Sequence, residues 1–265
     1  MIAEHSGAGI HFTTSGRADG PPVLLVNGLG ASGRSWFRLL PHLEPHARLL
    51  VVDNRGTGGS DRVRDRLTMT GMAADLLAVL DAAEVEAAHV VGLSLGGMAA
   101  QHLALDHRER VCSLVLGGTT AGGAWVRRGP PWRLVASGAL RRWLGPAGSF
   151  ELLAPALYGP ATLLDAPERV QEDVAVRQAD ATPPETFLAQ LAAAAGHDVR
   201  ARLAELEGLP VTVLHGLHDG VIPPDDGREL AAAIPGAKLV MIPGCGHMLT
   251  TDAVEVTARA VLDLV

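Results

Sequence analysis

The stretch AHVVGLSLGGMAAQHLA, residues 88–104, decides the fold. An apolar run enters Gly92-Leu93-Ser94-Leu95-Gly96, and a run rich in alanine and leucine leaves it. This pattern predicts a strand, a sharp turn and a helix, with Ser94 at the turn. A turn this tight strains the backbone of the serine, and glycines two residues before and after it avoid a collision. The hydroxyl is then lifted out of the sheet, which predicts a nucleophile.

Length and composition limit the classes of protein that the chain can be. Its 265 residues, 48% hydrophobic and 19% charged, fit one large α/β domain or a domain with an insertion. The net charge is −7 and Lys238 is the only lysine. No basic tract could therefore follow a phosphate backbone, and we expect no nucleic-acid partner.

The cysteines and the apolar segments bear on the compartment. Cys112 and Cys245 are too few for a disulfide framework, which favours a reducing environment. The amino terminus carries no apolar signal segment, and no run of about 18 apolar residues occurs. We therefore expect a cytoplasmic protein without a membrane partner, either a monomer or a homodimer.

Apolar runs alternate with helical spacing on both sides of the serine motif. Helical spacing is clearest from residue 69 onward, and residues 35–43 also read as a helix. Continuous apolar strands joined by helices predict an α/β fold with a mainly parallel, helix-covered sheet. Besides the strand before Ser94, the predicted strands are 9–16, 23–26, 47–52, 111–116, 210–216 and 237–242.

This alternation stops between residues 120 and 196. Prolines, arginines and short amphipathic pieces replace it, and no strand is evident. We interpret residues 120–196 as a helical cap inserted into a core formed by residues 1–119 and 197–265. The segment holds six of the nine aromatic residues, namely Trp125, Trp132, Trp143, Phe150, Tyr158 and Phe187.

The aromatic residues of this segment have two compatible interpretations: they form the core of the cap, or they line a ligand cleft. For the second interpretation we expect Trp125, Trp132 and Trp143 to contact the substrate, which would then carry an apolar moiety. Five arginines of the segment are interpreted as solvated, namely Arg127, Arg128, Arg133, Arg141 and Arg142.

A competing motif precedes the serine. The run Gly28-Leu29-Gly30-Ala31-Ser32-Gly33 matches the dinucleotide-binding pattern, and Asp53 follows Gly33 by 20 residues. An NAD(P)- or flavin-dependent oxidoreductase is therefore the main alternative. Against it, Tyr158 and Lys238 lie too far apart in sequence to form the common dehydrogenase dyad, and Ser94 would have no role.

A serine nucleophile needs a base and an acid that orients the base. Loops after the last two predicted strands carry Asp219 and His247, so we assign them as acid and base. The oxyanion needs two amide donors, for which we expect Leu95 and Leu29. This machinery accounts for the glycines of the competing motif as well, so we expect no cofactor and no metal.

Five motifs together resemble the α/β-hydrolase superfamily, in its order serine, aspartate, histidine. Within it, GLSLGGM and the asparagine of the oxyanion loop are most similar to the 3-oxoadipate enol-lactonase and small-esterase branch. Asn27 replaces the histidine that many relatives carry there, and we expect it to contact the substrate. The motifs are NGLG (27–30), DNRGTGGS (53–60), GLSLGG (92–97), GLHDGVIP (216–223) and GCGH (244–247).

The resemblance implies a cofactor-free serine hydrolase that cleaves a small-molecule ester or lactone through an acyl-enzyme. Ser94, His247 and Asp219 would form its catalytic triad. On the same fold, C–C bond hydrolysis, perhydrolysis and a tailoring step in secondary metabolism remain alternatives. A ligand-binding receptor with an intact triad is a further alternative.

Overall fold

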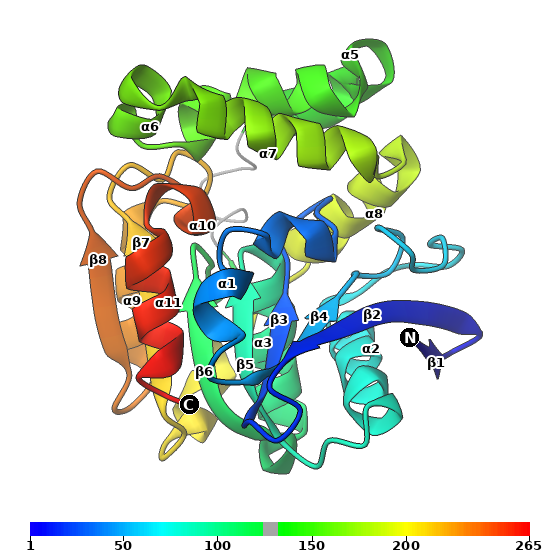
Figure 1. The fold of residues 1–265 in the computed structure, drawn as a ribbon, viewed down its shortest axis with the longest axis vertical. Coiled ribbons are helices and arrows are strands. Elements are labelled where there is room, and N and C mark those ends of the chain that lie inside the picture. Colours follow the sequence, from blue (N-terminus) through cyan, green and yellow to red (C-terminus); the bar gives the residue numbers. More distant parts are fainter. Residues whose placement is uncertain (124–131) are drawn as a thin grey trace.

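The computed structural model describes residues 1–123 and 132–265, apart from the side chains at positions 132–135, 137, 142 and 146. In this part of the chain eight strands form one sheet, in the order β1-β2-β4-β3-β5-β6-β7-β8 (Figure 1). The strands are β1 (Ile2–His5), β2 (Ala8–Gly16), β3 (Pro22–Val26), β4 (Arg48–Val52), β5 (Ala88–Leu93), β6 (Val111–Gly117), β7 (Val211–Gly216) and β8 (Lys238–Ile242).

All strand pairs from β4 across to β8 are parallel, and only β2 pairs antiparallel with β4 and with β1. The mainly parallel α/β sheet predicted from the sequence is therefore confirmed. Strand β1 has no counterpart among the predicted strands. It pairs with β2 through a tight turn at Ser6 and Gly7, which both have positive φ angles of 50° and 70°. Such a turn suits two short antiparallel strands.

Helices connect these strands. The helices are α1 (Leu40–Leu43), α2 (Met69–Ala82), α3 (Leu95–Asp106), α5 (Trp132–Leu157), α6 (Pro160–Asp165), α7 (Pro167–Ala179), α8 (Pro184–Ala195), α9 (Pro224–Ala233), α10 (Leu249–Asp252) and α11 (Val254–Leu262). The 3-10 turns are η1 (Gly33–Trp36), η2 (Arg108–Arg110) and η3 (Arg200–Leu206). The helix expected at 35–43 is instead split into η1 and α1. Pro41 lies in the first turn of α1, where its missing N–H is not needed.

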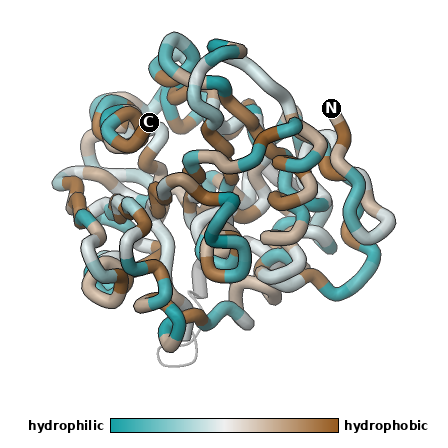
Figure 2. Tube along the Cα trace, turned by 90° about the horizontal axis from the view of Figure 1, so that it is seen from below, coloured by the Kyte–Doolittle hydropathy of each residue, from teal (hydrophilic) through white to brown (hydrophobic). Residues whose placement is uncertain are grey.

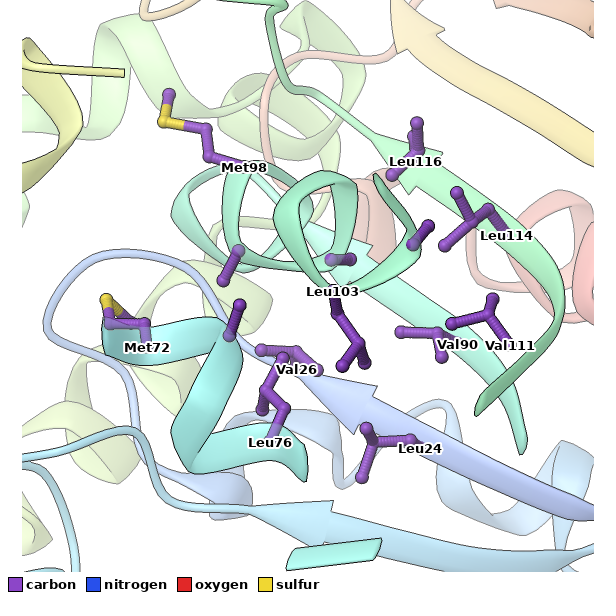
Figure 3. Close-up of a cluster of buried hydrophobic side chains, with 14 of the residues drawn as sticks. Leu24, Val26, Met72, Leu76, Val90, Met98, Leu103, Val111, Leu114 and Leu116 are labelled. Atoms are coloured by element: carbon purple, nitrogen blue, oxygen red, sulfur yellow. The ribbon is translucent and has the colours of Figure 1, made fainter. Parts of the chain in front are cut away.

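The sheet has a hydrophobic core on each face. Along β3, Leu24 and Val26 belong to one core, and Val23 and Leu25 belong to the other, because successive strand residues point to opposite faces. Figure 3 shows the first core, where Leu24 and Val26 meet side chains of α2 and α3. Helices α1 and α11 cover the other face. The double burial explains the continuous apolar runs of these strands.

The helices show the amphipathic pattern that this layering requires. In Figure 2 brown and teal segments alternate along the outer helices, as expected of elements with one face on the core and one face outward. Within the described residues, no helix combines the length and the apolar character that crossing a bilayer needs.

Helices α5, α6, α7 and α8 follow β6 and lie over one end of the sheet (Figure 1). They pack around a third hydrophobic core, which includes Phe150, Tyr158 and Phe187. The chain leaves and re-enters the sheet region at one place, because Gly122 and Asp198 form a β-bridge. The two ends of the segment predicted as a cap therefore meet.

A buried histidine lies at this junction. His197 is 3% exposed; its Nε2 lies 3.2 Å from the Thr120 carbonyl oxygen and its Nδ1 lies 3.3 Å from His102 Nε2. Burial, and then the neighbouring His102, lower the pKa of His197 to about 4, below its ordinary value of 6.5. The folded protein therefore holds His197 neutral at pH values where an unfolded chain would protonate it.

The substitution His197→Gln tests this junction. As the pH falls below 6.5, the imidazole binds a proton in the unfolded chain but not yet in the folded protein. Proton binding therefore favours the unfolded chain, and the free energy of unfolding decreases as the pH falls. For the wild type we expect the free energy of unfolding to fall by about 2 kcal/mol through this group between about pH 7.5 and pH 5. Glutamine can donate to Thr120 but does not titrate, so the variant should lose less stability in denaturant unfolding. His46→Gln, at an exposed position, is the control, and equal pH dependence in wild type and His197→Gln would contradict the assignment.

Candidate active site

Ser94 occupies a strained turn between β5 and α3. Its φ and ψ angles are 52° and −118°, a backbone conformation that residues other than glycine rarely adopt. A Cβ atom on Gly92 would lie 2.6 Å from the Gly96 carbonyl oxygen, and one on Gly96 would lie 2.2 Å from the Val26 carbonyl oxygen. Both glycines are therefore required on steric grounds, as the sequence predicts.

Two hydrogen bonds fix the strained peptide. The Ser94 amide donates to the Gly117 carbonyl oxygen at 2.8 Å, and Thr119 Oγ1 donates to the Ser94 carbonyl oxygen at 2.7 Å. The end of β6 thus holds the backbone on both sides of the Ser94 side chain. A conformation that costs free energy persists only when its surroundings hold it in this way.

Asp219 and His247 lie together on the loops after β7 and β8. Asp219 Oδ2 is 2.7 Å from His247 Nδ1, and Asp219 Oδ1 accepts hydrogen bonds from the Val221 and Ile222 amides, both at 2.8 Å. Burial would raise the pKa of Asp219, but the charge of His247 and hydrogen bonds from His215 and His247 outweigh it and hold the pKa at about 2. Asp219 is therefore ionised at neutral pH and can orient the imidazole.

His215 takes part in this arrangement, although the sequence suggests only a structural role for it. Its Nε2 lies 3.3 Å from Asp219 Oδ2 and 3.0 Å from the Ile222 carbonyl oxygen. A Cβ on Gly227 would lie 2.4 Å from His215 Nδ1, so α9 packs directly on the ring. The sequence does hold a signal for this role of His215: a histidine at the end of a buried strand, four residues before the acid.

Asp252 holds the loop that carries His247. Its Oδ2 accepts from the Gly246 and Gly159 amides, both at 2.7 Å, and its Oδ1 accepts from Thr162 Oγ1 at 2.6 Å. The same carboxylate thus ties the loop of His247 to the beginning of α6. Sequence reasoning missed Asp252, because no local motif connects it with residues 159–162.

The two predicted oxyanion donors lie on backbone segments next to Ser94. A Cβ on Gly28 would be 3.2 Å from Ser94 Cβ, and Gly30 has a positive φ of 64°. Among the described residues, no oxygen accepts a hydrogen bond from the Leu29 or the Leu95 amide. Leu95 is the first residue of α3, where amides have no partner within the helix. Both amides are therefore free to bind a developing negative charge.

Asn27 supports the loop that carries Leu29. Its side-chain amide donates to the Ser32 carbonyl oxygen at 2.7 Å, and its own carbonyl oxygen accepts from Asn54 Nδ2 at 2.8 Å. Asn27 also lines the cavity at Ser94, where the sequence analysis expects it to contact the substrate.

The competing dinucleotide motif is used internally. Asp53 Oδ1 accepts from the Gly33 amide at 2.6 Å, and Asp53 Oδ2 accepts from the Gly59 amide at 2.9 Å and lies 2.8 Å from His11 Nδ1. A Cβ on Gly58 would come within 2.2 Å of that carboxylate. Asp53 therefore binds its own loops, and its oxygens are not available for the hydroxyls of a ribose.

A cavity lies between the end of the sheet and the helices α5, α7 and α8. Ser94 and His247 line it from the sheet side, together with the oxyanion loop. Phe150 and Phe187 line it from the helical side, and both also belong to the third hydrophobic core. The two interpretations of the aromatic residues therefore hold together for these rings, which the sequence analysis did not single out as binding residues.

The expectation for the tryptophans is not met where it can be examined. Trp143 is 81% exposed and does not line the cavity, because it lies on the outer face of α5. Trp125 lies outside the described residues, and so does the side chain of Trp132. An aromatic residue at a helical position does not reveal from sequence alone which way it points.

For Arg141, the interpretation as a solvated arginine is wrong. It is 7% exposed and lines the cavity, and its guanidinium donates to the Thr182 carbonyl oxygen and to Ser149 Oγ. Arg127 and Arg128 lie outside the described residues, as do the side chains of Arg133 and Arg142. In the described part of the chain, no group of three or more histidine, cysteine or acidic side chains could hold a metal ion.

Comparisons with known proteins agree with this fold. A family model described as the alpha/beta hydrolase fold matches residues 21–253. A protein of Variovorax paradoxus named "Putative carbamate hydrolase RutD" is 32% identical over 257 residues, which cover 96% of this chain and 95% of that protein. A poly(3-hydroxyalkanoate) depolymerase of Ectopseudomonas oleovorans is 31% identical, covering 91% and 83% of the two chains.

Solved structures give the same result. The crystal structure of the enol-lactonase from Burkholderia xenovorans superposes with a TM-score of 0.88 at 26% identity, covering 100% of this chain and 99% of that chain. The strained turn at Ser94, the mainly parallel sheet and the matched family model lead to one conclusion: the chain belongs to the α/β-hydrolase fold family, and it is a hydrolase.

Proposed function

We propose that this hydrolase cleaves a carboxylic ester or lactone by serine catalysis without a cofactor. The observation that carries the proposal is the meeting of Ser94 and His247 in one cavity, with His247 held by the ionised Asp219. A serine hydroxyl becomes a nucleophile only beside such an oriented base. The strained Ser94 backbone supports the same role, because it exposes the hydroxyl to the cavity.

Each residue has a defined role in the proposed reaction. Ser94 Oγ attacks the carbonyl carbon while His247 Nε2 takes the hydroxyl proton, and the Leu29 and Leu95 amides bind the oxyanion. His247 then gives the proton to the leaving alcohol, which departs and leaves an acyl group on Ser94. Water attacks the acyl-enzyme by the same route, His247 taking its proton, and the acid is released with Ser94 restored. Asp219 keeps Nδ1 protonated throughout, so that Nε2 faces the reaction.

Two further proposals concern the domains of the chain and its cellular compartment. Residues 120–196 act as a cap on a core of residues 1–119 and 197–265, supported by the β-bridge between Gly122 and Asp198. The free thiols of Cys112 and Cys245 favour a reducing compartment such as the cytoplasm.

A carbamate is the second candidate substrate class. The relative from Variovorax paradoxus, named for carbamate hydrolysis, favours it. The same serine, histidine and oxyanion donors can attack a carbamate carbonyl, so the cavity and not the triad would decide. Measuring kcat/KM for an ester and for a carbamate with the same alcohol separates the two classes.

Ser94→Ala tests the nucleophile. We expect the variant to lose hydrolysis of a short activated ester, by on the order of 10⁴-fold or more in kcat, because it lacks the hydroxyl proposed to form the acyl-enzyme. A fluorophosphonate probe should label the wild-type protein at Ser94, as read by mass spectrometry of the digested protein. Labelling at another serine, or activity of Ser94→Ala near the wild-type level, would contradict the proposal.

Asp219→Asn tests the acid. An amide at this position favours the wrong tautomer of His247, so kcat should fall by on the order of 10⁴ while the fold, checked by circular dichroism, persists. Asp225→Asn is the matched control, since Asp225 lies in the first turn of the following helix, is exposed itself, and pairs with exposed Arg228 at 2.8 Å. If Asp225→Asn proved the more damaging substitution, the assignment of the acid would be wrong.

A further inference from the structure

Two arginines from the helical segment lie in the wall of the catalytic cavity. Arg141 is on α5 and Arg177 is on α7, and both line the cavity that Ser94 and His247 line from the other side. The proposed hydrolysis of an ester gives neither arginine a role. Cations are rare in a cavity otherwise lined largely by apolar groups such as Phe150, so a binding function is the natural explanation.

In the described part of the chain, both arginines bond to neutral oxygens and not to carboxylates. Arg141 donates from Nε and Nη2 to the Thr182 carbonyl oxygen at 3.2 and 2.9 Å, and from Nη1 to Ser149 Oγ at 3.1 Å. Arg177 donates from Nη1 to the Leu29 carbonyl oxygen at 3.0 Å. Among the described residues, no acidic side chain lies within ion-pairing distance of either guanidinium.

Other well-buried arginines of the chain do have acidic partners. Arg55 pairs with Asp75, and Arg38 pairs with Asp173 and Glu172. The charge of Asp173 acts to raise the pKa of Arg177. The Asp173 carboxylate, however, already pairs with Arg38 and accepts hydrogen bonds from Tyr158 and Thr251. Arg38 and Arg55 are thus neutralised by acids, whereas Arg141 and Arg177 have no acidic group within ion-pairing distance in the described part of the chain.

The two guanidinium groups are held in place by aromatic rings. The Arg177 guanidinium carbon lies 4.7 Å from the centroid of Phe150, and that of Arg141 lies 5.1 Å from the centroid of Phe187. Stacking on a ring occupies only the flat face of a guanidinium, so N–H groups that donate to no protein oxygen stay available. On Arg141, one N–H of Nη1 and one N–H of Nη2 remain after the bonds to Thr182 and Ser149. Because both rings also line the cavity, the arginines are oriented without being neutralised.

Burial disfavours the charge on both guanidinium groups. Burial, and then the nearby charge of Arg177, lower the pKa of Arg141 to about 10. Burial lowers the pKa of Arg177 as well. Two like charges held close together and away from water destabilise each other, and a bound anion removes this cost.

We infer that the cavity binds a carboxylate between Arg141 and Arg177, so that the preferred substrate is an ester or lactone that also carries a carboxylate. This inference rests on the proposed function. Guanidinium N–H edges match the two oxygens of a carboxylate, and apolar residues of the same cavity, such as Leu153 and Val221, suit a short hydrocarbon chain. The bond from Arg177 to Leu29 places the anion site beside the oxyanion loop, which favours a short distance between carboxylate and scissile carbonyl.

The test compares monomethyl glutarate with methyl pentanoate, which share an acyl chain length and differ in the terminal carboxylate. Methanol release gives kcat/KM for each. We expect the wild type to prefer the acidic ester by about tenfold or more, and Arg177→Gln to reduce that ratio by about tenfold, mainly through KM. High salt should weaken the wild-type preference. Arg169→Gln, on the same helix but outside the cavity, is the control and should keep the wild-type ratio.

The outcomes separate the two proposals. If the neutral ester is cleaved in a Ser94-dependent manner and the acidic ester is not preferred, the carboxylate site is wrong and the hydrolase stands. If neither ester is cleaved, glutarate binding is measured by calorimetry with the wild type and with Arg141→Gln and Arg177→Gln. Binding that these variants weaken supports the site, whereas no binding, or equal binding by folded variants, overturns it.

Discussion

The close approach of two backbones at the end of the sheet is the constraint on which the rest of this structure depends. Gly96 packs against the Val26 carbonyl oxygen at a separation that admits no side chain, and Gly28 packs against Ser94 at a separation that leaves little room for one. This contact strains Ser94, and it also brings the loop after β3 beside the first amide of α3. The candidate nucleophile and the candidate oxyanion donors therefore have one steric cause. Their positions are set by main-chain packing, which loop motion disturbs less than it disturbs side chains.

The carboxylates at the site connect it to the helical segment. Asp219 Oδ1 accepts hydrogen bonds from two amides of its own loop, and Asp219 Oδ2 bonds to His247. Asp252 binds the His247 loop and the start of α6 with the same carboxylate. Asp173 on α7 accepts from Thr251, one residue before Asp252. The histidine loop and the helices above it thus form one hydrogen-bonded unit, so a shift of these helices acts on the imidazole as well as on the cavity.

The sequence predicts those features whose cause is local. The strands appear as apolar runs because both faces of the sheet are covered, and the serine turn appears as spaced glycines because each glycine avoids a specific collision. Arg141 and Arg177 could not be predicted, because their burial depends on how α5 and α7 pack over the sheet. The prediction that Trp143 contacts the substrate was wrong for the same reason. Residue type indicates that an aromatic ring prefers burial, but it does not indicate which face of a helix packs against the rest of the protein.

The glycine-rich loop at residues 28–33 illustrates why a motif needs its partner atoms. In a dinucleotide-binding protein, glycines admit a pyrophosphate and a distant acid binds a ribose. Here the same spacing admits the Ser94 turn, and Asp53 binds the amides of Gly33 and Gly59. Both folds require a close approach to the loop after the first parallel strand, so both select glycine there. The acid distinguishes them: one whose oxygens are consumed by its own backbone stabilises a loop, and one left without a partner is available to a ligand. The same reasoning, applied with the opposite charge, separates Arg55, which Asp75 neutralises, from Arg141 and Arg177, which nothing in the described cavity neutralises.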